Sequence, residues 1–400
     1  MKKAAWVIPS FFEGSGGCRT IFQHINYMSE DYECDVYVYD VGDYRNEAQL
    51  KKAANKFYGI CKCNFFRGEE INEEKQYDAV IATSWFTVES VCKYSGAAKK
   101  YYFVQDYEPM FYSVGDEYVL ARNTYTQGLH VITIGKWLAW KISKDCDCET
   151  QYFDFCVDRS KYYRIENIQK EKAVCFICQP EKSRRCSKVG LEALRIVKKR
   201  FPETTIYLYG GTKKNHTDFE YVNKGIISVE DCNQLYNKCA VGLCISATNP
   251  SRIPFEMMAA GLPVVDIYWE NNLFDYSDEV IVLAQSDPTS IAQAIIDILE
   301  NEELRKRLTA NSQKFMMDRD LEYGFSQFMK ILDGSNETQT YGECVHQQYM
   351  KKPVLSGDEI IEFSKNVKIK EKKNIVDILK RNYWVRQIPG IKKIAGLIKS

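Results

Sequence analysis

The sequence predicts an α/β protein with two doubly wound domains, each built on a parallel sheet. Short runs rich in β-branched and aromatic residues alternate with segments of helical spacing, a pattern typical of parallel sheets with helices on both faces. The alternation occurs twice, and a polar stretch without periodicity at 152–172 separates the two series. A length of 400 residues also suits two domains of ordinary size.

The first series predicts an N-terminal Rossmann-like domain, which we place at 1–165. Strands are expected at 4–8, 34–40, 78–83, 99–106 and 130–134, and helices at 18–30, 46–59 and 86–96. The lysines and apolar run at the start resemble a signal peptide, but Pro9 interrupts the run and no small-residue cleavage site follows. We therefore expect the first strand here, in a cytoplasmic chain.

The second series predicts a C-terminal Rossmann-like domain, which we place at 170–335. Strands are expected at 173–178, 204–211, 240–246, 263–267 and 279–283. Helices are expected at 187–201, 229–239, 251–260, 287–301, 302–318 and 321–332. A linker and a basic tail make up 336–400.

Composition excludes several classes of protein. An apolar fraction of 45% and a charged fraction of 27% are those of a globular protein, and no apolar run reaches the roughly 18–20 residues of a membrane span. The fifteen cysteines are irregularly spaced, so we expect reduced thiols that pack as small hydrophobes. The four histidines have no ligand spacing, and both Asp-x-Asp matches, at 145–147 and 318–320, fall at helix ends, so no metal site is expected.

A glycine-rich stretch, Glu13 to Arg19, follows the first strand directly and contains Gly14, Gly16 and Gly17. Glycines allow a tight turn and let a ligand approach the N-terminus of the next helix. The alternatives are a purely structural turn and a nicotinamide site, for which Asp40 would be the ribose ligand. Arg19, however, replaces the third glycine of that fingerprint.

Carboxylates follow the strand at 99–106 in the stretch FVQDYEP. Asp106 and Glu108 stand at the carboxyl end of a central strand among aromatic residues, where desolvation raises a carboxyl pKa and suits a general base. The alternative is that either residue caps the helix expected near 115–117.

Cations and a short helix occupy the corresponding ends of the second domain. Arg184, Arg185 and Lys188 follow its first strand, where they could clamp a diphosphate or form a solvated basic loop. In NPSRIPFEMMAAGLPVVDI, at 249–267, a helix begins after Ser251 and carries Glu256 in its first turns. A helix N-terminus is a natural anion site.

Together these stretches resemble the GT-B-fold glycosyltransferases. PFEMMAAGLPVV is common to many sugar-nucleotide transferases, whereas FVQDYEP is similar to the bacterial rhamnosyltransferases of S-layer glycan and rhamnan synthesis. The resemblance runs from about 6 to about 332, through PEKSRRCSKVGLEALRIVKKRFPE and the helix motif. It implies a GT-B fold, two Rossmann-like domains that face a cleft between them.

The resemblance also implies site residues. Glu256 matches the carboxylate that binds the donor ribose. The backbone N–H groups of Ser251, Arg252 and Ile253 would meet the diphosphate, and the cations that would offset its charge are Arg184, Arg185 and Lys188. Loops such as those at Gly210 and Gly211 and at 222–229 would contact the base.

Two positions depart from the pattern of retaining relatives. Thr248 stands where many have a second Glu, and Gln105 stands where many have His. Both departures favour an inverting displacement in which Asp106 or Glu108 deprotonates the acceptor hydroxyl.

The predicted function is therefore transfer of a sugar, L-rhamnose from a dTDP-linked donor, to a hydroxyl of a growing surface glycan or lipid-linked glycan. No cofactor and no metal are expected. The alternatives are a GT-B-fold epimerase, a non-catalytic sugar-nucleotide binder and a nicotinamide dehydrogenase.

The tail concentrates positive charge. Between Phe363 and Ser400 there are eleven Lys or Arg residues and two acidic residues, a net charge of +9 in a chain whose total is zero. Basic residues mixed with Ile, Leu, Tyr383 and Trp384 suit an anionic membrane surface. A peripheral site at the inner membrane face is therefore predicted, with a solvated or partner-binding tail as the alternative. The folded part has no basic patch that suits nucleic acid.

Overall fold

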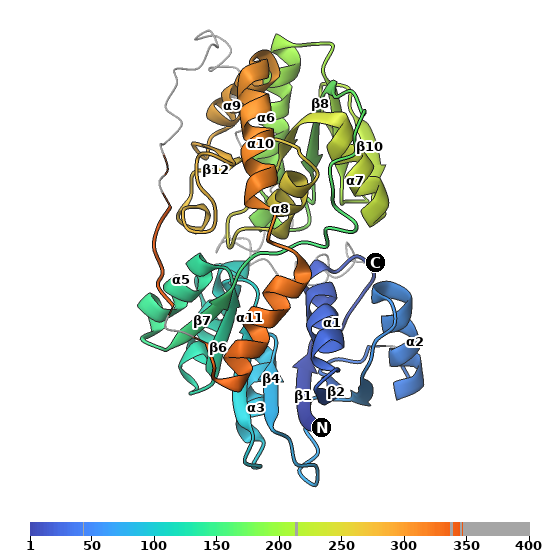
Figure 1. The fold of residues 1–400 in the computed structure, drawn as a ribbon, viewed down its shortest axis with the longest axis vertical. Helices are drawn as coiled ribbons and strands as arrows, with labels where there is room; N and C mark the ends of the chain where they lie inside the picture. The colour runs from blue at the N-terminus through green and yellow to red at the C-terminus, as the bar shows by residue number, and fades with distance from the viewer. Residues whose placement is uncertain (43, 213–214, 337–338, 345, 347–400) are drawn as a thin grey trace, which may run out of the picture. The chain divides into compact units, whose positions relative to one another are not determined.

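The computed structural model describes residues 1–42, 44–212, 215–336, 339–344 and 346 (Figure 1). The chain divides into two units, 1–353 and 354–400. The second unit, and with it the predicted basic tail, lies outside the described residues. Its predicted membrane contact therefore stays a prediction.

The first sheet has seven parallel strands in the order β3-β2-β1-β4-β5-β6-β7. Its strands are β1 Lys2–Ile8, β2 Tyr32–Val38, β3 Asn64–Arg67, β4 Ala79–Ala82, β5 Lys99–Val104, β6 His130–Ile134 and β7 Thr150–Phe153. Its helices are α1 Gly16–Met28, α2 Glu47–Tyr58, α3 Val88–Lys93, α4 Asp116–Asn123 and α5 Lys136–Cys146, with the 3₁₀ turns η1 Trp85–Thr87, η2 Glu108–Phe111 and η3 Thr124–Thr126.

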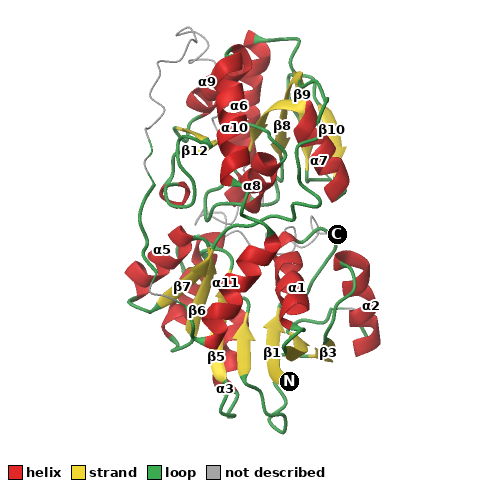
Figure 2. Cartoon of the chain, viewed as in Figure 1, coloured by secondary structure: helices red, strands yellow, loops and turns green. Residues whose placement is uncertain are grey.

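The second sheet has six parallel strands in the order β10-β9-β8-β11-β12-β13 (Figure 2). Its strands are β8 Glu171–Ile177, β9 Thr205–Tyr209, β10 Val222–Gly225, β11 Cys239–Leu243, β12 Val264–Ile267 and β13 Val282–Ala284. Its helices are α6 Ser187–Arg200, α7 Val229–Lys238, α8 Arg252–Ala259, α9 Pro288–Glu300 and α10 Glu302–Phe315, with the turns η4 Ser183–Arg185 and η5 Glu270–Asn272. The predicted α/β class with two Rossmann-like sheets is confirmed.

Burial on both faces explains why the central strands read as apolar runs. In β1 the register pairs Ala4 with Cys34 on one side and with Ala79 on the other. Trp6 packs into one face of the core and Val7 into the other, and both side chains are fully buried. Alternate residues therefore meet helices on opposite faces, as parallel sheets require.

A last helix, α11 Leu321–Asp333, returns to the first sheet. Figure 1 shows it, in orange, beside β7 and α1. The Tyr101 hydroxyl donates to the Leu332 carbonyl at 3.0 Å, and Phe328 packs against Trp6. The predicted boundary at 335 assigns this helix to the second domain by chain order, whereas its contacts are with the first sheet.

The structure adds strands that lacked a sequence signal. β7 begins just before the stretch expected to be a linker and extends into it, and β3 and β10 are edge strands with few buried residues. An edge strand that faces solvent needs no apolar run, so periodicity does not reveal it. All fifteen cysteines are free thiols. None of the helices in the described part of the chain is long and apolar enough to cross a membrane.

Candidate functional site

The glycine-rich loop leaves the start of α1 open. Gly14 has a φ of 81°, which a residue with a Cβ rarely adopts, and the Ser15 hydroxyl caps α1 by accepting the Cys18 N–H at 3.3 Å. Gly16 and Gly17 form the first turn, and a Cβ on Gly16 would meet nothing within 4 Å. The open space is compatible with a ligand at this helix N-terminus.

Asp106 stands two residues beyond β5 and faces the loop between β8 and α6 that contains Arg184 and Arg185, which we call the cation loop. Its Oδ2 lies 3.8 Å from Arg184 Nε, and its side chain is 24% exposed. Its Oδ1 is buried and has no partner in hydrogen-bonding geometry among the described residues, although the nearby Thr248 side chain and Tyr107 backbone lower the pKa of the carboxyl. Burial raises the pKa of Asp106, and the positive charge of Arg184 opposes the rise. A carboxylate with one unoccupied oxygen suits a general base.

Glu108 has a different environment. Its side chain is buried, and Oε2 accepts the Trp85 N–H at 2.7 Å and the Ser84 hydroxyl at 3.1 Å. Burial raises the pKa of Glu108 to about 7 despite these two bonds. Glu108 therefore holds the loop after β4 through Oε2, whereas neither the Ser84 hydroxyl nor the Trp85 N–H is bound to Asp106.

The predicted cations lie where β8 leads into α6. Arg184 stacks over the ring of Phe111, with 4.3 Å between the guanidinium carbon and the ring centroid. The Nε of Arg185 is buried without a hydrogen-bond partner among the described residues. Burial lowers the pKa of the neighbouring Lys182, and Arg185 and Arg184 lower it further. Lys188 is exposed in the first turn of α6. Mutual repulsion of this kind favours a bound anion.

Ser251, the residue before α8, caps the N-terminus of this helix. Its Oγ accepts the Ile253 N–H at 3.3 Å. The Arg252 guanidinium extends to the first sheet's helix α1, where it donates to Thr20 Oγ1 at 2.7 Å and to Gln23 Oε1 at 3.3 Å. The Arg252 side chain thus links α8 to α1, which its position in the sequence did not indicate.

Glu256 is half-buried one turn further along α8. Burial raises its pKa, and three arginines oppose the rise: Arg252, Arg19 and Arg185. Arg19 was not among the predicted site residues. Its signal was its place at the start of α1, where a dinucleotide fingerprint would have glycine. The structure puts this cation close to Glu256.

Gly210 and Gly211 end β9 and have a packing role. Gly210 has a φ of 85°, and a Cβ on Gly211 would lie 2.5 Å from the Cys178 carbonyl oxygen. The Gly210 carbonyl accepts from Gln179 Nε2 at 2.8 Å. Both glycines let the loop after β9 lie against the loop after β8.

Three loops converge on Gln105. The side-chain Nε2 of Gln105 donates to the Gly17 backbone carbonyl at 3.2 Å, and the backbone carbonyl of Gln105 accepts from Asn249 Nδ2 at 2.9 Å. Asn249 precedes α8, so the glycine-rich loop, the strand end that carries Asp106 and the α8 loop meet at one place. The structure thus brings most of the predicted site residues to a common region.

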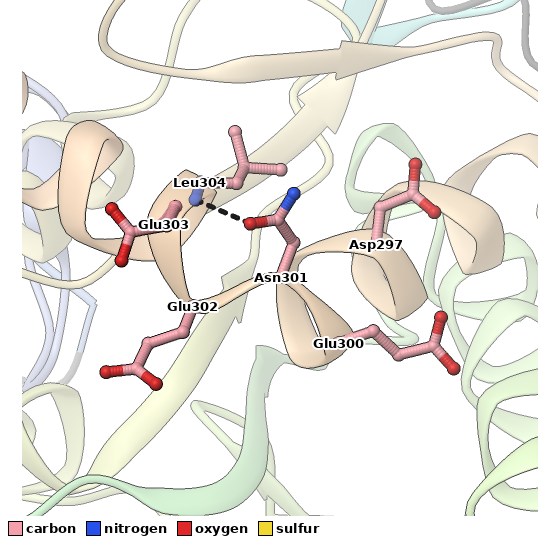
Figure 3. Close-up of a pocket in the computed structure, with 6 residues that line it drawn as sticks. All are labelled: Asp297, Glu300, Asn301, Glu302, Glu303 and Leu304. Carbon is pink, nitrogen blue, oxygen red and sulfur yellow. Dashed lines mark hydrogen bonds between the residues drawn. The ribbon is translucent and has the colours of Figure 1, made fainter.

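A hollow elsewhere on the second sheet's helices does not contain any of these residues. Figure 3 shows it at the junction of α9 and α10, where it is lined by Asp297, Glu300, Asn301, Glu302, Glu303 and Leu304. The side-chain Oδ1 of Asn301 caps α10 by accepting the Leu304 N–H at 2.9 Å. Four carboxylates in one hollow disfavour a diphosphate, because like charges repel.

Comparisons with known proteins show which proteins the chain resembles. A family model described as WsaF, C-terminal domain, matches residues 172–296. The chain is 28% identical over 344 residues to the O-antigen biosynthesis protein RfbC of Myxococcus xanthus, a match that covers 83% of this chain and 27% of the relative. The chain therefore spans about a quarter of that relative's length.

Solved structures decide the fold. Anabaena HepE, in complex with UDP and glucose, superposes with a TM-score of 0.65 at 14% identity over 84% of this chain and 100% of that chain. S. aureus TarM, in complex with Fondaparinux, alpha-GlcNAc-glycerol and UDP, gives 0.65 at 12% identity over 83% and 100%. The fold is GT-B. In this GT-B chain, Asp106 belongs to the first sheet and Arg184 to the second.

Proposed function

We propose that the chain is a glycosyltransferase that moves a sugar from a nucleotide-diphosphate donor to a hydroxyl of a surface glycan. The observation that carries the proposal is Asp106, a carboxylate with an unoccupied oxygen, 3.8 Å from an arginine of a cation loop. A base beside a diphosphate clamp is what displacement of a diphosphate by a hydroxyl requires.

The proposed reaction accounts for each bond that forms or breaks and for the proton of the acceptor. The acceptor oxygen attacks the anomeric carbon, and its proton passes to Asp106. The bond from the anomeric carbon to the diphosphate oxygen breaks, and its electron pair leaves with the diphosphate. Arg184, Arg185 and the N-terminus of α8 offset the charge that develops there, so the proposed reaction is metal-independent.

The finer assignment is also a proposal. Glu256 binds the donor ribose, and the chain acts as a rhamnosyltransferase with dTDP-rhamnose and an inverting outcome. Its support is the FVQDYEP stretch together with Thr248 and Gln105, the two departures from retaining relatives. The O-antigen relative supports a surface glycan as the product.

A donor-consumption assay tests the reaction type. The purified chain is incubated with dTDP-rhamnose, UDP-glucose or GDP-mannose, with and without oligosaccharides, and released nucleoside diphosphate is quantified. A transferase releases diphosphate faster when an acceptor is present. Consumption without an acceptor and with an epimerised sugar would instead identify an epimerase, and binding without turnover would identify a binding protein.

A further inference from the structure

Four aromatic side chains follow the carboxyl ends of β2, β4 and β5. We call Tyr39, Phe86, Trp85 and Tyr112 the aromatic ridge. Ring centroids lie 4.9 Å apart for Tyr39 and Phe86, 5.9 Å for Phe86 and Trp85, and 6.1 Å for Trp85 and Tyr112. Tyr39 is 38% exposed and the other three are half-buried. The ridge is therefore a continuous row of partly exposed rings.

The ridge is held rigidly. Trp85 Nε1 donates to the Tyr112 hydroxyl at 3.0 Å, and the Trp85 backbone N–H is bound by the buried Glu108. Because the Tyr112 hydroxyl is the acceptor here, its own proton can still be donated to a ligand oxygen. Rigid Trp and Tyr rings present a large surface at a low cost in conformational entropy.

The ridge leads to the proposed base. The guanidinium carbon of Arg184 lies 4.3 Å from the ring centroid of Phe111, the residue before Tyr112. Arg184 Nε in turn lies 3.8 Å from Asp106 Oδ2. These two contacts join Asp106 to the residue before Tyr112, at one end of the ridge. Structural packing alone does not require rings to stay partly exposed at the edge that carries the site, and exposed apolar surface of this kind often marks a ligand groove.

Charge restricts the class of ligand. All four ridge residues are uncharged, and the exposed Asp40 follows Tyr39 directly, at the end of the row away from Phe111 and Arg184. A carboxylate at this end disfavours a polyanionic glycan or an anionic lipid surface along the ridge. The faces of neutral sugars carry apolar C–H groups that can pack on aromatic rings, and their hydroxyls can pair with the Tyr112 hydroxyl.

From this arrangement we infer that the aromatic ridge binds the acceptor as a neutral oligosaccharide, several sugar units long, whose terminal hydroxyl reaches Asp106. The inference rests on the proposed glycosyltransferase function and adds the residues and the chemical class of the acceptor. It predicts that affinity increases with the number of sugar units, because each further unit contacts another ring.

Saturation-transfer NMR and titration with neutral oligosaccharides test the inference. The probes are linear chains of one to four units of L-rhamnose, D-mannose or D-glucose, with a sulfated tetrasaccharide and anionic vesicles as contrasts. At least one neutral series should bind more tightly with length, and Phe86→Ala should weaken the longest member by about 10-fold, near the upper end for one aromatic contact. Tyr39→Ala should weaken the longer members only.

The controls separate the ridge from the rest of the site. Tyr323→Ala removes a ring that is 43% exposed on α11 and should bind as wild type does. Nucleoside diphosphates should raise the melting temperature of every variant by the same amount. Tyr39→Ala changes an exposed position, so it still tests the ridge if Phe86→Ala does not fold. If wild type binds none of the neutral series, if it binds only the sulfated probe or vesicles, or if both ridge variants bind as wild type does, the inference is wrong. If nucleoside diphosphates do not raise the melting temperature of wild type, the proposed function itself is wrong.

Discussion

Arg184 connects the two sheets at the point where the chemistry is proposed, because its Nε lies 3.8 Å from Oδ2 of Asp106. Asp106 follows β5 of the first sheet, and Arg184 lies between β8 and α6 of the second. The pair places the proposed base directly beside the cation that would bind the leaving diphosphate. We therefore expect the carboxylate to affect turnover and the cations of this loop to affect donor binding.

Replacing Asp106 with Asn should lower kcat by about 10²- to 10⁴-fold, the usual contribution of general base catalysis. The shape of the side chain is kept, so nucleoside diphosphates should still raise the melting temperature. The control is Asp40→Asn, at an exposed position that a nicotinamide site would require. Asp40→Asn should leave turnover unchanged, and an unchanged rate in Asp106→Asn would refute the role of the base.

The same carboxylate predicts a pH profile. Burial raises the pKa of Asp106 above 3.8, and a base must be deprotonated to act. The value of kcat/KM for wild type should therefore fall as the pH drops through this raised pKa. In Asp106→Asn the residual rate should lack this acidic limb. If the acidic limb of kcat/KM occurs at the same pH in both proteins, it belongs to a group other than Asp106.

Replacing Arg185 with Gln should weaken binding of a nucleoside diphosphate by about 10- to 100-fold, as expected for a charge-assisted hydrogen bond. Binding of the nucleoside itself should change little, because the lost contact is with phosphate. Lys188→Gln provides the comparison: Lys188 is exposed, so we expect an effect below about threefold. Calorimetry with both ligands measures these differences. Equal effects of the two substitutions would mean that general charge, and no defined contact, attracts the donor.

Glu108 predicts a pH dependence of stability. Its pKa is raised from 4.5 to about 7 in the folded state, so the fold favours the protonated form. Its stabilising contribution is complete below about pH 4.5 and is lost as the pH rises towards 7. Asp266 and Asp275, whose pKa values burial raises to about 7 and about 6, act in the same direction. Denaturant unfolding from pH 4.5 to 7.5 should therefore show a smaller loss of stability in Glu108→Gln than in wild type. Parallel curves would contradict the assignment.

Arg252 and Thr20 should be energetically coupled. The 2.7 Å bond between the guanidinium and the Thr20 hydroxyl joins α8 to α1, and hydrogen bonds to charged groups contribute about 1.5–3 kcal/mol. A double-mutant cycle with Arg252→Gln and Thr20→Val, measured by denaturant unfolding, should give a coupling energy of at least about 1 kcal/mol. Gln23→Ala, which removes the longer 3.3 Å contact, should couple more weakly. Additive effects of Arg252→Gln and Thr20→Val would show that the bond does not contribute.

The sequence revealed the sheets wherever burial on both faces produced a continuous apolar run. β1, β5 and β8 are of this kind, and so the loops that follow them, with Asp106 and Arg184, could be placed at strand ends. Edge strands such as β10 had no such run because their side chains face solvent. Fold class was therefore predictable, and sheet width was not.

Contacts between distant segments could not be predicted, because no local pattern records them. The motif around 249–267 suggested a helix N-terminus, but nothing in it showed that the Arg252 side chain would reach Thr20 in α1. Glu108 and Asp106 looked equivalent as bases until the structure placed Ser84 and Trp85 on Glu108 alone. Arg19 was read as a missing glycine, and its proximity to Glu256 depends on how α1 and α8 meet.

A thermal-shift titration of wild type against dTDP, UDP, GDP and NAD tests the nucleotide-diphosphate site most directly. A ligand that binds only the folded state raises the melting temperature by mass action, by an amount equivalent to about 2.7 kcal/mol at 100 times its Kd. The proposal predicts a shift with dTDP, and a shift with UDP or GDP alone would keep the transferase and change the donor. A shift with NAD alone, or none with any nucleoside diphosphate, would contradict the proposed function.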